Sequence, residues 1–209
     1  MTFLALFVQN KTKMSDGNTE GTPMIIGDSV ETTRQRLLQM VKAYLLGAIH
    51  DATERKLTFR ISQKYKSYPV FIKELLAKIG KKAWIYKEGK TRKVYIVEFS
   101  KSFLKGFKVN SPEEKKYYIK GYFDSEGGIT KNPKLRLYIY FAQKDKLDLE
   151  EVRNFLLEFG ISCGIIHNPS KKADPDYWRF FIRAKSYSDF SKIIGSWYPE
   201  KSRLLRMKI

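Results

Sequence analysis

The strongest constraint on the fold of this chain is an internal repeat with an offset of 80 residues. Gln63-Lys64 and Gln143-Lys144 each end a stretch in which apolar and polar residues alternate, and a glycine, Gly80 or Gly160, follows each glutamine after 17 residues. The alternation predicts two strands, and the segments between them and the glycines predict helices with glycine caps. The sequence therefore predicts two similar folding units in one chain.

Matching apolar positions extend the repeat through both predicted helices. Four positions on one helical face coincide in the two copies: Ile72, Leu75, Leu76 and Ile79 in the first, and Val152, Phe155, Leu156 and Phe159 in the second. Residues 100–103 later match residues 184–187, with four extra residues in the intervening hairpin loop. We predict an α+β fold of two pseudo-symmetric αββαββα-type repeats, with a leader at residues 1–30, a first repeat at 31–108 and a second at 109–209.

The charge of the chain favours a polyanionic partner. Forty Lys and Arg residues against 22 Asp and Glu give a formal net charge of +18. Such an excess is typical of nucleic-acid binding, and no long amphipathic Lys-rich helix points to a membrane surface. The alternative is the Lys-rich surface of a thermophilic protein, in which Glu would nearly balance Lys. Nucleic acid is therefore the predicted partner.

The scarcity of cysteine and histidine limits the metal chemistry that is possible. Cys163 is the only cysteine, and His50 and His167 are the only histidines, so a Cys- or His-rich metal site is excluded. Any metal would be a hard cation bound by oxygen. The apolar stretch at residues 3–8 is too short for a signal sequence or a membrane span. We expect a soluble intracellular protein with no membrane partner, associated with the nucleoid if prokaryotic.

The alternating segments predict one apolar and one cationic face in each copy. Leu57, Phe59 and Ile61 in the first copy, and Leu135, Leu137, Ile139 and Phe141 in the second, are predicted to face the core. The alternative is an ordinary half-buried strand with a solvated outer face. Because a sheet can enter the major groove, we predict DNA contacts from both copies. The predicted contact residues are Lys56, Thr58, Arg60, Lys93, Lys134, Arg136, Tyr138, Tyr140 and Arg179.

Two further helices carry a glycine in mid-helix and acids at the C-terminal end. One has Gly47 followed by Asp51; the other begins at the Ser111-Pro112 start signal and has Gly121 followed by Asp124 and Glu126. Facing glycines allow two helices to pack backbone to backbone. The converging acids would repel each other and the helix dipoles, and a divalent cation would supply the missing charge. The alternative is that they are solvated caps on unrelated helices.

The stretches LLGAIHDAT at 45–53 and IKGYFDSEG at 119–127 resemble the two motifs of LAGLIDADG homing endonucleases of the single-chain, archaeal intron-encoded type. The resemblance covers roughly residues 40 to 200. It implies motif helices packed at a central pseudo-dyad and two antiparallel β-saddles that bind a long double-stranded DNA site. It also implies a monomer that cleaves both strands across the minor groove with Mg²⁺ or another hard cation such as Mn²⁺.

Carried over by position, the resemblance assigns roles within the motifs and beyond them. Glu126 and the Ser125 carbonyl match metal ligands, and Asp124 matches an acid that serves helix end and packing. Gln63 and Gln143 match a glutamine that orders water. Lys201, and Lys115 or Lys116, resemble the basic residue near the site; Lys116 and Lys201 are the predicted catalytic lysines.

The first motif departs from the family pattern. With Gly47 aligned, Ala52 holds the position of the metal-binding acid, and Asp51 comes one residue early. One residue is a rotation of about 100° in an α-helix, so Asp51 reaches the site only if the last turn is tightened. We predict Asp51 as the ligand and His50 as a packed or capping residue. The alternatives are a cleavage-deficient DNA binder or an RNA maturase with the same fold.

Overall fold

A computed structural model describes residues 30–209 with the exception of 90–91 and 133, so most of the predicted leader and the apolar stretch at 3–8 lie outside the described residues. It confirms an α+β fold of two repeats. The first contains α2 (Val30–Ala48), η1 (Ile49–Asp51), β1 (Ala52–Glu54), β2 (Thr58–Gln63), α3 (Ser67–Lys78), β3 (Ala83–Lys87), β4 (Tyr95–Ser100) and η2 (Ser102–Leu104). The second contains α4 (Pro112–Glu126), β5 (Gly127–Ile129), β6 (Ile139–Gln143), α5 (Lys146–Glu158), β7 (Trp178–Phe181), η3 (Ala184–Ser186), α6 (Tyr187–Ile193) and α7 (Pro199–Lys208).

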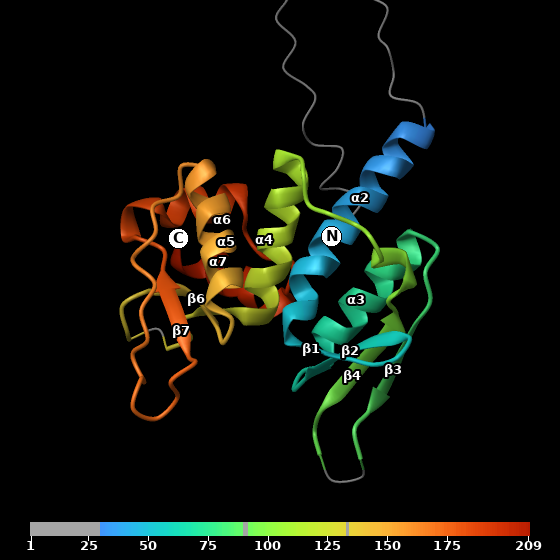
Figure 1. The fold of residues 1–209 in the computed structure, drawn as a ribbon, viewed down its shortest axis with the longest axis horizontal. Helices are drawn as coiled ribbons and strands as arrows, with labels where there is room; N and C mark the ends of the chain where they lie inside the picture. Colours follow the sequence, from blue (N-terminus) through green and yellow to red (C-terminus); the bar gives the residue numbers. More distant parts are fainter. Residues whose placement is uncertain (1–29, 90–91, 133) are drawn as a thin grey trace, which may run out of the picture.

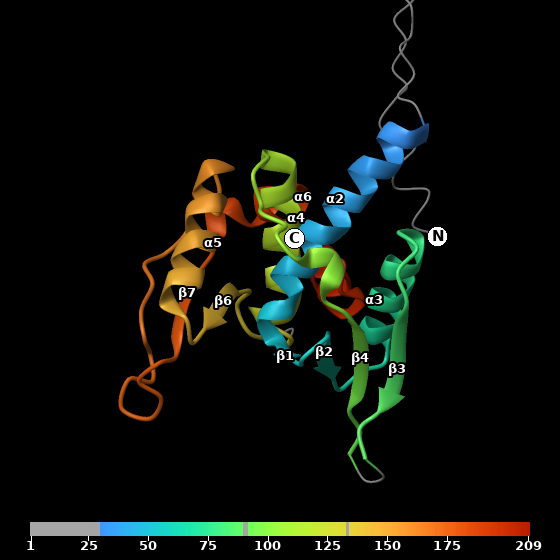
Figure 2. The ribbon, with the colours of Figure 1, turned by 45° about the vertical axis from the view of Figure 1, so that its right-hand side comes forward.

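Each repeat forms its own antiparallel sheet. The strand order is β1-β2-β4-β3 in the first repeat and β5-β6-β7 in the second. In place of a counterpart to β3, the described part of the second repeat has two isolated bridges, Cys163 with Ile182 and His167 with Arg179. Figures 1 and 2 show the hairpin between β3 and β4 and the long loop before β7 extending from the same side of the molecule. The two sheets are therefore related but unequal.

Helices α2 and α4 lie side by side between the repeats, as both views show. A Cβ added to Gly47 would lie 2.1 Å from the Tyr118 carbonyl oxygen, and one added to Gly121 would lie 1.9 Å from that of Tyr44. These distances leave no room for any side chain at either glycine. The predicted backbone-to-backbone packing is confirmed, and it offsets the roughly 1 kcal/mol that a mid-helix glycine costs relative to alanine.

Local signals in the sequence explain where the helices begin and end. The Ser111 side chain accepts a hydrogen bond from the backbone N–H of Glu114, whose carboxylate accepts in return from the backbone of Ser111, so the predicted capping box is present. Gly80 and Gly160 follow α3 and α5 with φ of 69° and 73°, a left-handed conformation that favours glycine. None of the described helices is long and apolar enough to cross a membrane.

Two apolar clusters form the cores of the repeats. One is built from α4, α5 and the second sheet, with Phe123, Phe141 and Phe180 fully buried. The other is built from α2, α3 and the first sheet, and Tyr198 from the second half of the chain joins it. The segment before α7 thus ties the two cores together.

Two predicted core residues are in fact exposed. Leu57 is 71% exposed and Leu135 is 59% exposed. The alternation in the sequence extends beyond the strands, since β2 begins only at Thr58 and β6 only at Ile139. Both leucines lie in the turns that precede these strands, where alternation no longer assigns a face. The prediction that they face the core was wrong.

Candidate active site at the ends of the central helices

Helix α2 ends with a tightened turn. The α-helix stops at Ala48, and a 3-10 turn, η1, carries the chain through Asp51 to an extended Ala52 with φ of −94° and ψ of 143°. Helix α4, by contrast, stays α-helical through Glu126. A 3-10 turn has about 3.0 residues per turn in place of 3.6, so η1 changes the direction of the Asp51 side chain. The tightened turn on which the prediction of Asp51 depended is present.

The short strands that follow show which acids are equivalent. Ala52 begins β1 and pairs with Ile61, and Gly127 begins β5 and pairs with Phe141. Ile61 and Phe141 lie 80 residues apart, which is the offset of the repeat. Strand register therefore makes Ala52 the counterpart of Gly127, although alignment on the helix glycines had matched it to Glu126.

Asp51 and Glu126 thus occupy equivalent places, each directly before its short strand. Asp51 Oδ2 lies 3.4 Å from Gln63 Nε2, which donates a hydrogen bond to it. Desolvation by the surrounding protein raises the pKa of Asp51, and the positive charge of Lys201 opposes that rise. Ala52, in contrast, packs against the first core.

Glu126 has a similar environment with a stronger effect on its ionisation. Burial and then the negative charge of Asp51 raise the pKa of Glu126 to about 7, while a hydrogen bond from Gln143 and the charge of Lys201 act in the opposite direction. The two acids are therefore close enough to repel one another. Each has a glutamine beside it, Gln63 or Gln143, at the end of the neighbouring strand.

These residues fit a hard divalent cation. The described residues hold no cluster of three or more His, Cys, Asp or Glu side chains, so a site made wholly of such ligands is absent from that part of the chain. Mg²⁺ needs fewer, because it usually takes one or two carboxylates and completes its shell with water and phosphate. The mutual repulsion of Asp51 and Glu126 would be relieved by such an ion. Ser125, whose carbonyl is a predicted ligand, lies beside them on the last turn of α4.

Lys201 from α7 holds the end of α4. Its Nζ donates to the carbonyl oxygens of Phe123 at 2.6 Å, Asp124 at 2.9 Å and Gly127 at 2.6 Å. A lysine ammonium has three donors, so all of them are used. Burial lowers the pKa of Lys201 to about 8, although the negative charges of the neighbouring acids act in the opposite direction. Lys201 is thus a fixed positive charge beneath the acids, with no donor left for a substrate.

Asp124 is buried and has a structural role, as the resemblance implies. Its carboxylate accepts hydrogen bonds from Tyr44 Oη at 2.7 Å, the backbone N–H groups of Trp197 at 2.9 Å and Tyr198 at 3.0 Å, and the Ser196 hydroxyl. These bonds fix the segment before α7, which in turn positions Lys201. They compensate for the burial that raises the pKa of Asp124.

His50 takes the place of Asp124 in the first repeat. Its Nε2 lies 2.9 Å from Tyr118 Oη, and its Nδ1 lies 2.9 Å from a carboxylate oxygen of Asp148 at the start of α5. The Tyr118 contact mirrors the bond between Tyr44 and Asp124 across the helix pair. His50 is therefore a packed residue that joins α2 to α5, in line with the prediction.

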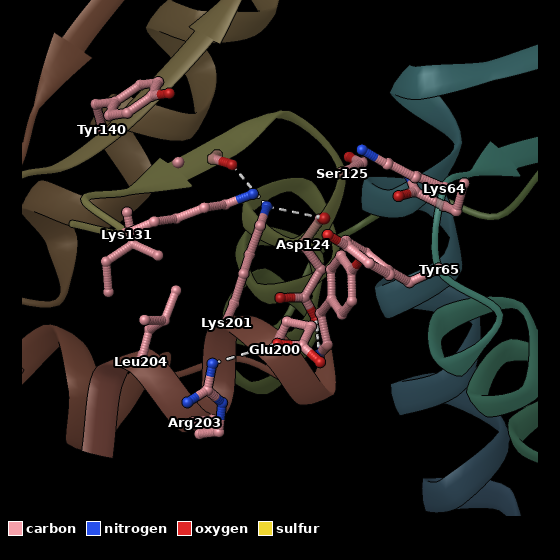
Figure 3. A pocket seen from close by; sticks show the side chains of 15 residues that line it. Lys64, Tyr65, Asp124, Ser125, Lys131, Tyr140, Glu200, Lys201, Arg203 and Leu204 are labelled. Atoms are coloured by element: carbon pink, nitrogen blue, oxygen red, sulfur yellow. Dashed lines mark hydrogen bonds and ion pairs between the residues drawn. The ribbon is translucent and has the colours of Figure 1, made fainter. Parts of the chain in front are cut away.

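A cavity of about 570 Å³ lies beside these residues. It is lined by the end of α4, by β5 and by Lys64 and Tyr65 just after β2. Figure 3 shows Lys131 and Lys201 extending toward one another inside it, and the charge of Lys131 contributes to the lowered pKa of Lys201. The sequence reasoning missed Lys131, because it lies in a loop of a Lys-rich chain and no motif marks it.

Lys116 is not brought to the acids. It lies on α4 ten residues before Glu126 (126 − 116), which is about 15 Å along a helix with a rise of 1.5 Å per residue. Lys115 is engaged elsewhere, with its Nζ 2.6 Å from Glu158 and over the Phe155 ring. The helix geometry removes Lys116 from the candidate site, and the contact with Glu158 removes Lys115. The cations that line the cavity are Lys64, Lys131, Lys201 and Arg203.

Comparison with known proteins agrees with this geometry. Residues 113–195 match the family model of the LAGLIDADG-like domain. The structure of I-DmoI in complex with DNA and Mn is 21% identical, covers 76% of this chain and 97% of its own, and superposes with a TM-score of 0.58. This chain has the LAGLIDADG fold. The resemblance predicted from the two motifs is confirmed.

Other structures with the LAGLIDADG fold show its breadth. I-DmoI in complex with DNA and Ca is 20% identical, covering 81% of this chain and 98% of its own, with a TM-score of 0.60. The N-terminal LAGLIDADG domain of DUF199/WhiA is 17% identical, covering 83% and 94%, with a TM-score of 0.59. No curated protein matches the sequence. At these identities the likeness establishes the fold alone.

The predicted DNA-contacting residues of the first LAGLIDADG repeat lie on or near the outer face of its sheet. Lys56 is exposed before β2, and Lys93 lines a lysine- and tyrosine-rich hollow beside the β3–β4 hairpin. Thr58 and Arg60 are engaged with acids: the Thr58 hydroxyl donates to Glu98 at 2.6 Å, and Arg60 lies between Glu88 and Glu98. The expected cationic face thus contains carboxylates that the sequence reasoning missed.

The outer face of the second sheet is aromatic and cationic. The Tyr138 and Tyr140 rings lie 5.8 Å and 6.0 Å from that of Phe181. Arg179 is positioned over Phe181 at 5.1 Å and Arg136 over Tyr138 at 6.0 Å. Lys134 is exposed in the loop before β6. This face has the composition that the sequence predicted.

Proposed function

We propose that the chain is a site-specific endonuclease for double-stranded DNA, of the homing endonuclease kind, that hydrolyses phosphodiester bonds with Mg²⁺ or Mn²⁺. The observation that carries the proposal is the placement of Asp51 and Glu126 in equivalent positions at the ends of two closely packed helices, where the negative charge of Asp51 helps to raise the pKa of Glu126. Repulsion of this kind is unfavourable unless a cation binds between the acids.

Asp51, Glu126 and the Ser125 carbonyl would hold the metal. When bound, the metal would activate water and stabilise the leaving oxygen. Gln63 and Gln143, each beside one acid, would orient water at the two strands. Lys201 would hold the carbonyl end of α4 in place and offset the negative charge of the acids, and Lys131 would face the DNA backbone from the cavity.

DNA would bind along both sheets as a single long site. The repeat at 31–108 and the repeat at 109–209 would each read one half-site with the outer face of a sheet in the major groove. The pseudo-dyad between α2 and α4 would then lie over the minor groove, with one acid for each strand. A monomer suffices, because both halves of the site are in one chain.

The test is cleavage of a randomised duplex library by the full chain, with and without Mg²⁺ or Mn²⁺, followed by sequencing of the cut ends. We expect metal-dependent double-strand cuts at one family of sequences. Asp51→Asn and Glu126→Gln should each reduce cutting more than about 100-fold, because changes to outer-shell partners alone typically cost 10- to 100-fold. Lys116→Met is the matched control and should cut normally. Normal cutting by both acid variants would rule the proposal out.

A second candidate is a protein of the same fold that binds DNA or intron RNA without cutting. The observation that favours it is the irregular first motif, in which Asp51 comes one residue earlier after the helix glycine than Glu126 does and lies on a 3-10 turn. If this candidate is right, the selected duplex remains intact with either metal, or an RNA competes for the chain more strongly than the duplex. Nicking of one strand only would mean that the Glu126 half alone is active.

A further inference from the structure

Glu98 lies at the centre of the first sheet's outer face. It is in the middle of β4, and β4 lies between β2 and β3. Its neighbours in sequence, Val97 and Phe99, are buried in the first core, so Glu98 points to the opposite face. Arg60 and Trp84 are its direct cross-strand partners.

The Glu98 carboxylate is held in one orientation. The Thr58 hydroxyl donates to Oε1 at 2.6 Å, and the Tyr86 hydroxyl donates to Oε2 at 2.5 Å. The side chain is 21% exposed. These hydrogen bonds lower the pKa of Glu98, so it is ionised. Each carboxylate oxygen can accept two bonds, so acceptor capacity remains for a ligand.

Arg60 is fixed beside it. Its guanidinium lies 3.8 Å from both Glu88 and Glu98 and over the Tyr86 ring at 5.6 Å, with the side chain 15% exposed. Within the described part of the chain, Arg60 Nε is buried and has no hydrogen-bond partner. Two carboxylates balance its charge, so Arg60 is poorly suited to phosphate binding.

An ionised carboxylate on a face that meets DNA is repelled by phosphates and can gain only from base edges. In the major groove, the exocyclic amino groups are the donors that it can meet, and Glu pairs with the N4 amino group of cytosine. Arginine pairs with O6 and N7 of guanine. A C·G pair presents these groups side by side on one edge, as Glu98 and Arg60 are side by side on the sheet.

We propose that Glu98 is a specificity-determining residue that, together with Arg60, reads one C·G base pair in the half-site of the first repeat. The proposal rests on the proposed function, because it requires DNA along the outer face of the sheet. It assigns Glu98 to base selection, while the exposed lysines around it bind phosphates.

The experiment is selection of bound duplexes from a randomised library, in an otherwise intact chain that carries Glu126→Gln so that binding is measured without cleavage. Glu98→Gln is compared with Glu74→Gln, which removes the same charge from an exposed position on α3. We expect Glu98→Gln to lower the preference for one C·G pair about tenfold or more and to leave other positions unchanged. Glu74→Gln should leave every position unchanged.

Three results would bear on the inference in different ways. A wild-type preference retained at every position in Glu98→Gln would overturn it. An equal loss across many positions, together with a lower melting temperature, would also overturn it and assign Glu98 to sheet stability. Specific binding without cleavage by the chain with Glu126 intact would defeat the proposed nuclease activity and leave the reading by Glu98 in place.

Discussion

The two repeats differ most where their functions should be most alike. In the second repeat, five residues separate the helix glycine from the acid (126 − 121) and α4 is regular to its end; in the first, four residues do (51 − 47), and the 3-10 turn η1 takes up the difference. The short strands then restore the register. Strand pairing therefore identifies Asp51 as the equivalent of Glu126, whereas alignment of the sequence motifs alone places the first acid one residue too late, at Ala52.

The two sheets differ in strand number and also in the chemistry of their outer faces. Arg60 pairs across the strands with Glu98 in the first sheet, and Tyr140 pairs with Phe181 in the second. The outer face of the first sheet carries a fixed hydrogen-bond donor, Arg60, and a fixed acceptor, Glu98. The outer face of the second carries aromatic rings beneath Arg136 and Arg179. A symmetric scaffold thus presents two unlike surfaces, which suits an asymmetric DNA site.

In the contact between α2 and α4, each helix glycine faces the backbone of the other helix, and substitutions there should have the largest effect. Gly121→Ala and Gly47→Ala each place a Cβ about 2 Å from a carbonyl oxygen of the partner backbone, which cannot move aside. We expect each to lower the free energy of unfolding by about 3 kcal/mol or more. Gly164→Ala, whose Cβ would lie 3.5 Å from the nearest atom, is the control and should change little. Urea unfolding measures all three, and a tolerated Gly121→Ala would mean that the helices are farther apart than described.

Moving the first acid by one residue should test the register directly. In the double variant Asp51→Ala with Ala52→Asp, the carboxylate takes the position that the motif alignment favours. Because Ala52 packs against the first core, we expect loss of cleavage as severe as in Asp51→Asn, together with lower stability. A cleavage assay with a melting curve decides this, and restored cutting would show that the motif alignment, and not strand pairing, identifies the ligand.

Much of this arrangement could be predicted from the sequence because it depends on local signals. The capping box at Ser111, the glycines at 80 and 160, and the packing of Gly47 against Gly121 each follow from a residue type with few structural uses. The repeat then fixed the order of helices and strands. The first residues of β2 and β6 could not be predicted, because the alternation of apolar and polar residues extends through Leu57 and Leu135, which lie in turns.

The remainder depends on contacts between residues far apart in the chain. No pattern near Lys201 indicates that it donates three hydrogen bonds to the end of α4, and no pattern near Glu98 indicates that Thr58 and Tyr86 hold it. Lys131 and Lys116 look alike in the sequence, and only the fold brings one to the cavity and leaves the other about 15 Å along the helix. Such choices are made by tertiary packing.

The raised pKa of Glu126 should make the stability of the protein depend on pH, with a smaller effect than those of the substitutions above. The pKa of Glu126 is about 7 in the metal-free folded protein against an ordinary 4.5, so the folded state binds more protons than the unfolded state between these values. The contribution of Glu126 to the free energy of unfolding is therefore fully present below about pH 4.5 and is lost as the pH rises through about 7. We expect this decrease in the free energy of unfolding to be on the order of 1 kcal/mol after allowance for solvent screening. It should be absent in Glu126→Gln, which has no carboxyl group to titrate at this position.

Magnesium should oppose that fall, because it binds the ionised carboxylate. Melting curves of the wild type, Glu126→Gln and Asp51→Asn at pH 5 and pH 8, with and without Mg²⁺, measure the effect. We expect Mg²⁺ to raise the wild-type melting temperature at pH 8 and to have little effect at pH 5 or on Glu126→Gln. An equal Mg²⁺ effect at both pH values would place the bound ion elsewhere.

The smallest expected effect distinguishes the arginines of the two sheets. Arg136 is exposed over Tyr138, and no ion pair to it is found among the described residues, whereas two carboxylates balance Arg60. Arg136→Ala should therefore reduce the slope of log affinity against log salt by about 0.9, the contribution of one phosphate contact. Arg60→Ala should leave the slope nearly unchanged and weaken binding only to duplexes with the selected C·G pair. DNA-binding titrations at several salt concentrations measure both slopes. Equal slopes for the two variants would mean that Arg60 in the first repeat binds a phosphate as Arg136 in the second repeat does.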